Sequence, residues 1–221
     1  MQNSGHSSGG SDEIRGRGRP RGFDRAAALA AATRLFWQKG FEATSIADLT
    51  AAMGIGSPSL YAAFGSKEGL YTEALRHYCE NYDALVWNGF RTAASGREAV
   101  ARYLLDSAAA LTGCTADNPL GCMVTLSSVG SEDHAELGER MRVARSVTRD
   151  RLLERLTHAA ETGELPADAD LSALARFFQT VQAGMSILAR DGASRAELEA
   201  VAQRALCAWD AAGGSTGGEG A

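Results

Sequence analysis

Apolar residues recur at intervals of three and four along most of the chain, which is the spacing of one face of an α-helix. The first such run begins after Asp24, an expected N-cap, and stops at Gly40. Its apolar stripe comprises Leu29, Ala32 and Phe36. No segment alternates polar and apolar residues as a half-buried strand does. The pattern therefore predicts an all-α fold.

Two short helices are predicted directly after the first. One begins after Thr44 or Ser45 and ends at Gly54, and the next occupies residues 57–64 with a proline at its first turn. Gly54 and Gly56 in the connection permit a sharp change of direction. Two short helices joined in this way are typical of a helix-turn-helix, in which the second helix enters the DNA major groove.

The remainder of the chain predicts longer helices without an internal repeat. An N-terminal three-helix DNA-binding domain would thus precede a C-terminal helical bundle that serves ligand binding and dimerisation. The expected divisions are a disordered basic arm (1–22), the DNA-binding domain (23–68), the bundle (69–212) and a flexible tail (213–221). The expected later helices are 66–87, 97–111, 120–129, 133–161, 170–190 and 194–211.

Charge separates the two parts of the chain. The net charge is −5, yet basic residues outnumber acidic ones between Arg15 and Tyr78, and the reverse holds from Cys79 onward. In the arm, Arg17, Arg19 and Arg21 alternate with glycine and proline, which predicts an extended cationic segment able to enter a narrow minor groove. Phosphate binding is therefore expected from the N-terminal third alone.

The second helix of the pair supplies candidate base contacts. With Leu60 and Phe64 turned inward, the outer side of residues 57–64 carries small and hydroxylated side chains that can approach base edges and phosphates. Lys67 and Thr44 lie at the starts of neighbouring helices, where backbone N–H groups also favour phosphate. The candidates on the second helix are Ser57, Ser59, Tyr61 and Ala62.

These residues carry a family resemblance that runs from Phe23 to Tyr78. The segments beginning Leu35-Phe-Trp-Gln-Lys-Gly-Phe and Ser59-Leu-Tyr-Ala-Ala-Phe-Gly-Ser-Lys resemble the DNA-binding domain of the TetR family of bacterial repressors. The resemblance implies a homodimer that binds a palindromic double-stranded operator and releases it when a small-molecule effector enters the C-terminal domain. It also implies phosphate contacts by Thr44, Tyr61 and Lys67. Unlike many members, this chain lacks a Lys or Arg near the start of the reading helix.

The last two predicted helices present apolar faces broad enough for a dimer interface. Gly184 would allow a close approach of two helices, and a core confined to one chain is the alternative that periodicity cannot separate. The candidate interface residues are Phe177, Phe178, Val181, Gly184, Met185, Leu188, Leu198, Val201 and Trp209.

An effector cavity is expected among the helices before this pair. Aromatic rings and thioethers make adaptable apolar walls, although each of these side chains also suits ordinary core packing. The candidate lining residues are Trp87, Phe90, Tyr103, Leu104, Cys122, Met123, Leu126 and Met141.

Two other function classes are alternatives to a ligand-relieved repressor. A metal- or thiol-responsive regulator on the same scaffold would use Cys114, Cys122, Met123 and His134, but these lack tight ligand spacing, so no metal or other cofactor is expected. An enzyme is not expected, because the chain has no Glu-x-x-His pair, phosphate-binding glycine loop or nucleophile elbow. Without an export signal or an apolar stretch of membrane-spanning length, the cysteines predict reduced thiols in a cytoplasmic protein.

Overall fold

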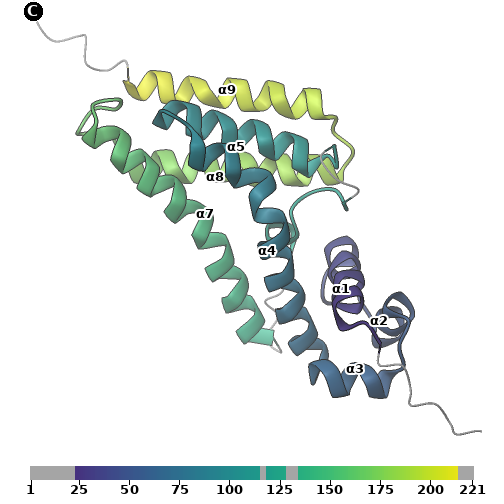
Figure 1. Cartoon of the computed structure of the whole chain (residues 1–221). Coiled ribbons are helices and arrows are strands. Elements are labelled where there is room, and N and C mark those ends of the chain that lie inside the picture. Colours follow the sequence, from purple (N-terminus) through teal and green to yellow (C-terminus); the bar gives the residue numbers. More distant parts are fainter. Residues whose placement is uncertain (1–22, 115–117, 128–133, 214–221) are drawn as a thin grey trace, which may run out of the picture.

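The structure is a computed structural model that describes residues 23–114, 118–127 and 134–213. These residues form nine α-helices and no strand, so the all-α prediction is confirmed for them (Figure 1). None of these helices is both long enough and apolar enough to cross a membrane. The helices are α1 (Arg25–Lys39), α2 (Ile46–Met53), α3 (Ser57–Phe64), α4 (Lys67–Thr92), α5 (Gly96–Leu111), α6 (Met123–Leu126), α7 (Ala135–Glu161), α8 (Leu171–Arg190) and α9 (Arg195–Gly213).

The ends of the first helices follow from their capping residues. The Asp24 carboxylate accepts hydrogen bonds from the backbone amides of Ala26 and Ala27 and so begins α1. Ser45 and Asp48 form a reciprocal capping box at the start of α2. Gly54 ends α2 with a φ of 65°, a left-handed conformation that glycine adopts without steric cost. The predicted glycine turn between α2 and α3 is therefore present.

The reader domain, by which we mean α1, α2 and α3, is held together by a small apolar core. Leu49 of α2 and Leu60 of α3 are both 0 % exposed, and Phe36 of α1 packs in the same cluster. The N-terminal half of α4 contributes Leu70 and Tyr71 to this core. Burial of these side chains fixes the angle between α2 and α3, because each apolar side chain loses its stabilisation if the helices separate.

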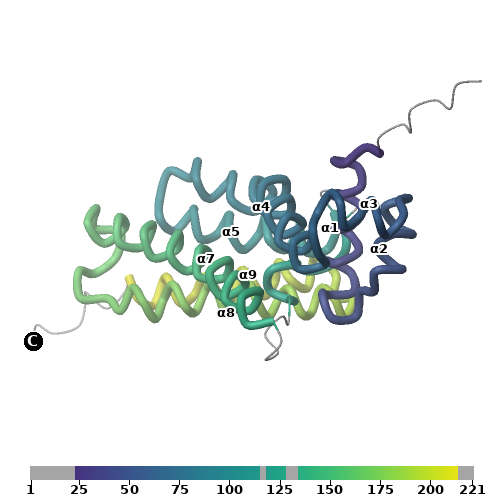
Figure 2. Tube along the Cα trace, turned by 90° about the horizontal axis from the view of Figure 1, so that it is seen from below, coloured from purple at the N-terminus to yellow at the C-terminus, as the bar shows by residue number. Residues whose placement is uncertain are grey.

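Helix α4 connects the reader domain to the rest of the molecule. It packs against α1 near its start and against α5 further along, so one continuous helix contacts both parts. The ribbon and tube views show the reader domain at one end of α4 and helices α5, α8 and α9 gathered at the other (Figures 1 and 2). Helix α7 runs from the reader domain to the helices at the far end of α4. Its residues Leu137 and Met141 belong to the apolar core of the reader domain.

The C-terminal bundle consists of α5, α7, α8 and α9 around a second apolar core. Helix α5 is central, since it packs against α4, α7, α8 and α9. Its first residue, Gly96, is placed where a Cβ atom would lie 2.7 Å from both Ala159 and Trp209. Only a glycine leaves room for this close approach of α5 to α7 and α9. Tyr103 and Phe178 are among the largest side chains buried in this core.

Several predicted helix bounds shift in the structure. The helix expected over 120–129 is limited to Met123–Leu126, because Gly121 has a φ of 76° and the chain is not helical before Cys122. Helix α4 continues past the expected end at residue 87 to Thr92. The predicted arm, residues 1–22, and most of the predicted tail lie outside the described residues.

Candidate nucleic-acid interface and internal cavity

The outer face of α3 presents the side chains that the sequence predicts for it. Ser57, Ser59 and Ala62 are exposed, and Tyr61 is 47 % exposed. The opposite face is anchored by Leu60, which is fully buried. The result is a short, unobstructed helix face of hydroxyl, methyl and phenol groups. Such a face can donate and accept hydrogen bonds at base edges and contact a thymine methyl group.

Lys67 lies just beyond α3, at the first position of α4. Its Nζ atom is 4.2 Å from the centre of the Phe41 ring, and the side chain is partly exposed. The ring attracts the ammonium group through a cation–π interaction and so restricts its position beside the reader domain. Lys67 thus lies at the start of α4 beside α3, and its phosphate contact stays a prediction.

Thr44 is placed differently from its predicted role. Its side chain is 0 % exposed, and its hydroxyl donates a hydrogen bond of 2.6 Å to the carbonyl oxygen of Gly40. The hydroxyl therefore stabilises the loop between α1 and α2 and is not presented to a phosphate. The neighbouring Ser45, predicted only as a possible helix start, is exposed at the N-terminus of α2.

Two other groups of basic residues bear on this surface. Arg17, Arg19 and Arg21 fall outside the described residues. Arg25, at the start of α1, lies 4.5 Å from the centre of the Phe64 ring of α3 and forms a 2.7 Å ion pair with Glu73. The pair links α1 to α4 beside the C-terminal end of α3.

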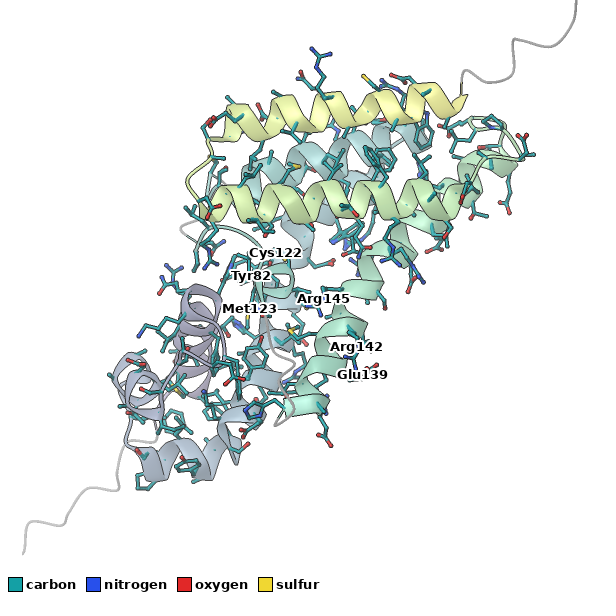
Figure 3. All side chains as sticks on the ribbon, turned by 180° about the vertical axis from the view of Figure 1, so that it is seen from behind. Tyr82, Cys122, Met123, Glu139, Arg142 and Arg145 are labelled. Carbon is teal, nitrogen blue, oxygen red and sulfur yellow. The ribbon has the colours of Figure 1, made fainter. Side chains whose placement is uncertain are left out.

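An internal cavity of about 340 Å³ lies between α4, α5, α6, α7 and α8. Four aromatic side chains from α4 and α5 form much of its wall, and the rings of Trp87 and Tyr103 are 4.8 Å apart. Figure 3 shows two of the lining residues, Tyr82 and Cys122, between the C-terminal bundle and the reader domain. The lining residues are Tyr78, Cys79, Tyr82, Asp83, Val86, Trp87, Tyr103, Cys122, Val124, Thr125, Ala144, Val147, Thr148, Arg151 and Gln182.

The predicted cavity residues divide into two groups. Trp87, Tyr103 and Cys122 line the cavity, as predicted. The other five do not line it, because each packs elsewhere. Phe90 lines a groove between α4 and α7, and Leu104 is enclosed in the core of the C-terminal bundle. Leu126 contacts the turn at Gly121, and Met123 and Met141 belong to the apolar core of the reader domain.

Charged and hydroxyl groups at the cavity are paired or protonated. Arg151 forms a short ion pair with Asp83, and its guanidinium carbon lies 4.9 Å from the centre of the Trp87 ring. Burial raises the pKa of Tyr78 and of Tyr103 well above the ordinary value for tyrosine. Both phenols therefore keep their protons at neutral pH and remain hydrogen-bond donors.

Trp37 of α1 connects the cavity wall to the reader domain. Its ring packs edge-on against Tyr78 at 4.8 Å and Tyr82 at 5.1 Å, measured between ring centres. Its indole N–H donates a 2.9 Å hydrogen bond to the carbonyl oxygen of Gly121. A ligand that displaced either tyrosine would therefore press directly on α1.

Arg190, the last residue of α8, forms a second connection. Its Nε atom donates to the carbonyl oxygen of Leu120 at 2.9 Å. Its Nη1 and Nη2 atoms donate to the carbonyl oxygens of Gln38 and Trp37 at 3.0 and 2.9 Å. The carbonyl groups of Trp37 and Gln38 belong to the last turn of α1, where the helix dipole favours a cation. Arg190 was not predicted from the sequence, because a basic residue at the end of a helix is common.

Comparison with known proteins identifies the family. The sequence model described as "Bacterial regulatory proteins, tetR family" matches residues 28–74. The HTH-type transcriptional repressor ComR of Escherichia coli (strain K12) is 37 % identical over 87 % of this chain and 92 % of its own. The HTH-type transcriptional repressor BdcR of the same organism is 35 % identical over 85 % and 90 %. This chain belongs to the TetR family.

A solved structure of another member supports the same assignment. A cysteine mutant of the TetR family transcriptional regulator CifR, complexed with 26-bp double-strand operator DNA, matches this chain with a TM-score of 0.81 and 41 % identity. The match covers 87 % of this chain and 100 % of that one. Together these comparisons show a TetR-family transcriptional regulator with a helix-turn-helix domain, and not an enzyme.

In this TetR-family fold, α8 and α9 leave an apolar face uncovered. Phe177, Leu188 and Val201, all predicted interface residues, are 40, 46 and 39 % exposed. Val181 and Gly184 lie partly exposed on the same face of α8, and no atom lies within 4 Å of where a Gly184 Cβ would be.

Four other predicted interface residues were wrongly placed. Phe178, Met185, Leu198 and Trp209 are at most 4 % exposed, because they face the core of their own chain. Ile187, which is 52 % exposed beside Leu188, was missed. The width of the apolar face indicates that part of it lies outside the core, but only the packing of α8 and α9 shows which residues do.

The cysteines of this regulator give little support to metal or thiol sensing. No group of three His, Cys, Asp or Glu side chains suited to a metal ion occurs among the described residues. The thiol of Cys79, though part of the residue is exposed, has a pKa raised by burial to about 11, so the reactive thiolate is scarce at neutral pH. Cys122 accepts a hydrogen bond from the Tyr78 hydroxyl at 3.3 Å.

Proposed function

We propose that this TetR-family protein is a homodimeric repressor that binds a palindromic operator through α3 and is released by a small-molecule effector. The observation that carries the proposal is the exposed outer face of α3, with Ser57, Ser59, Tyr61 and Ala62 held outward by the buried Leu60 and Phe64. The two curated relatives named above are described as repressors, and the related CifR structure includes operator DNA.

Two copies of α3 are needed for useful specificity, because one short helix reads only a few base pairs. The uncovered apolar face of α8 and α9 supports dimerisation, since four large apolar side chains on it are 39 to 52 % exposed. Burial of this face against a second copy would place two reader domains at a fixed separation. A palindromic operator with half-sites about one DNA turn apart would match such a dimer. Operator binding also implies a cytoplasmic protein.

Effector relief requires that the cavity and the reader domain move together. The contacts of Trp37 with Tyr78 and Tyr82 supply one mechanical connection, because both tyrosines also line the cavity. Arg190 supplies another, since it binds α1 from the end of the proposed dimer helix α8. A ligand that favours a different position of α1 would shift the population toward dimers whose α3 helices no longer match successive major grooves.

The proposal is tested by selecting binding sites from a random double-stranded DNA library with purified protein. We expect enrichment of one inverted repeat, bound by two protomers. Lys67 and the arm arginines would add affinity without sequence preference, so the selection is done at moderate salt, where nonspecific binding is weakened. If no sequence is enriched, or if the enriched site has a single half-site bound by one protomer, the proposal is wrong.

A further inference from the structure

The cavity is aromatic and has no unpaired ionic group among its lining residues. The two charged side chains that line it, Asp83 and Arg151, form an ion pair with each other. Arg91 also bonds to Asp83, from the outer side. Both charges of this pair are already engaged, so a charged ligand would have to compete with an existing ion pair or bind without a counter-ion of its own. The lining therefore favours an uncharged molecule.

Gln182 is the unusual polar residue of this lining. It lies on the apolar face of α8 and is only 9 % exposed, yet its side-chain amide has no hydrogen-bond partner among the described residues. Gln179, one turn earlier, differs, because its amide donates a 2.7 Å hydrogen bond to the carbonyl oxygen of Arg145. The amide atoms of Gln182 are not fully enclosed by protein, so they are available to pair with a molecule bound in the cavity.

Tyr103 contributes an aromatic ring to the same lining. Its hydroxyl is buried and has no hydrogen-bond partner within the described ranges. Its ring lines the cavity opposite Trp87, and burial keeps the phenol protonated. The hydroxyl is enclosed by protein and not exposed to the cavity, so Tyr103 contributes only its ring, and the buried lining group that both donates and accepts is the primary amide of Gln182.

We propose that the cavity binds an uncharged, flat aromatic molecule bearing a carboxamide. The ring would lie among Tyr78, Tyr82 and Trp87, and the carboxamide would pair with the amide of Gln182. A carboxamide complements Gln182 at both its donor and its acceptor, which a ketone or a hydrocarbon does not. The cavity volume of about 340 Å³ is near the lower end for ligand sites and suits a molecule of one or two fused rings. This inference rests on the proposed function only for the claim that the bound molecule would release the operator.

Three compounds of matched shape test the ligand class by calorimetric titration of the full-length protein. They are 2-naphthamide, 2-naphthoate and 2-isopropylnaphthalene, which differ only in whether the substituent is an uncharged amide, an anion or a hydrocarbon. We expect 2-naphthamide to bind once per protomer and about tenfold or more tighter than 2-naphthoate. Failure of 2-naphthamide to bind, or equal or tighter binding of the anion, would overturn the inference.

Substitution of Gln182 tests which group makes the contact. Gln182→Leu keeps the size of the side chain and removes its amide, so binding of 2-naphthamide should weaken about tenfold while 2-isopropylnaphthalene binds at least as well as before. The matched control is Gln203→Leu on an exposed position of α9, which should change neither value. Unchanged binding of 2-naphthamide by Gln182→Leu would contradict the assignment. If that variant does not fold, Gln182→Met is titrated with the same compounds and judged by the same criteria.

A separate measurement distinguishes this inference from the proposed function. Operator binding is followed by fluorescence anisotropy with and without saturating 2-naphthamide. If the compound binds in a Gln182-dependent manner and operator affinity falls, both proposals stand. If it binds in that manner without any loss of operator affinity, the ligand class stands and effector relief is wrong. If operator binding itself is absent, the DNA-binding proposal fails whatever the titrations show.

Discussion

Replacement of Arg190 by Ala removes the guanidinium that joins α8 to the end of α1. Three hydrogen bonds of 2.9 to 3.0 Å are lost at once, and two of the carbonyl groups belong to the last turn of α1. Burial lowers the pKa of Arg190 from its ordinary value, which indicates that the group is partly removed from water. The loss is therefore larger than for a fully exposed arginine.

The expected magnitude follows from these contacts. Each bond contributes a net of about 0.5–1.5 kcal/mol, and the favourable position at the end of α1 adds roughly 0.3–1 kcal/mol. Because the side chain remains partly exposed and the freed carbonyl groups can bind water, we expect Arg190→Ala to lower the free energy of unfolding by about 2 kcal/mol. Arg190→Lys keeps the charge but not the planar fork of donors, and should recover about half of this loss.

Urea unfolding at a fixed protomer concentration measures this change, since the stability of a dimer depends on concentration. The matched control is Arg102→Ala, which removes an exposed arginine of α5 that pairs with Glu98 within the same helix at 3.6 Å. The control should change stability by less than about 0.5 kcal/mol. Operator affinity should fall for Arg190→Ala and not for the control. Equal unfolding curves and equal operator affinities for the two variants would refute the role given to Arg190.

Three further predictions test other parts of the account. Lys67→Ala should weaken binding to the operator and to random DNA alike, and the slope of log affinity against log salt concentration should become smaller by about one. Ala62→Ser should instead change the base preference. If both variants lose affinity equally for every DNA sequence, this division of roles is contradicted. Leu188→Glu should give monomers in sedimentation experiments, whereas Val143→Glu, at a 55 % exposed position of α7, should not; a dimeric Leu188→Glu protein would exclude the proposed interface. Cys79, with its pKa raised from 9.0 to about 11, should react with iodoacetamide at pH 7.5 about tenfold slower in the folded than in the unfolded chain, because scarcer thiolate outweighs its greater nucleophilicity; equal rates would show that the thiol is not shielded.

The reader domain was largely predictable from the sequence, because its signals are local. Asp24, Ser45 and the glycines at the helix ends act on residues within one turn of themselves, so helix positions followed without knowledge of the tertiary fold. The outward face of α3 followed from Leu60 and Phe64, since two inward residues on a short helix determine the opposite face. Thr44 was misjudged because its role depends on a contact with Gly40 across a loop.

The cavity and the dimer face were less predictable, because they depend on how distant helices meet. Periodicity placed Phe177 and Phe178 on the same broad apolar face, but only the packing of α8 on α5 and α9 shows that one is buried and the other exposed. Met123 and Met141 suited a cavity wall in composition, yet α6 and the start of α7 pack against the reader domain. Gln182 did carry a signal, as a polar residue within an apolar helix face.

The central claim is that two copies of the α3 outer face read one palindromic DNA site. The most direct measurement is the stoichiometry and sequence preference of the complex, obtained by sedimentation of the protein with the selected operator and with a scrambled duplex of equal length at moderate salt. We predict two protomers on the operator and at least about a thousandfold weaker binding to the scrambled duplex. A single protomer on the operator, or equal affinity for the two duplexes, would contradict the account.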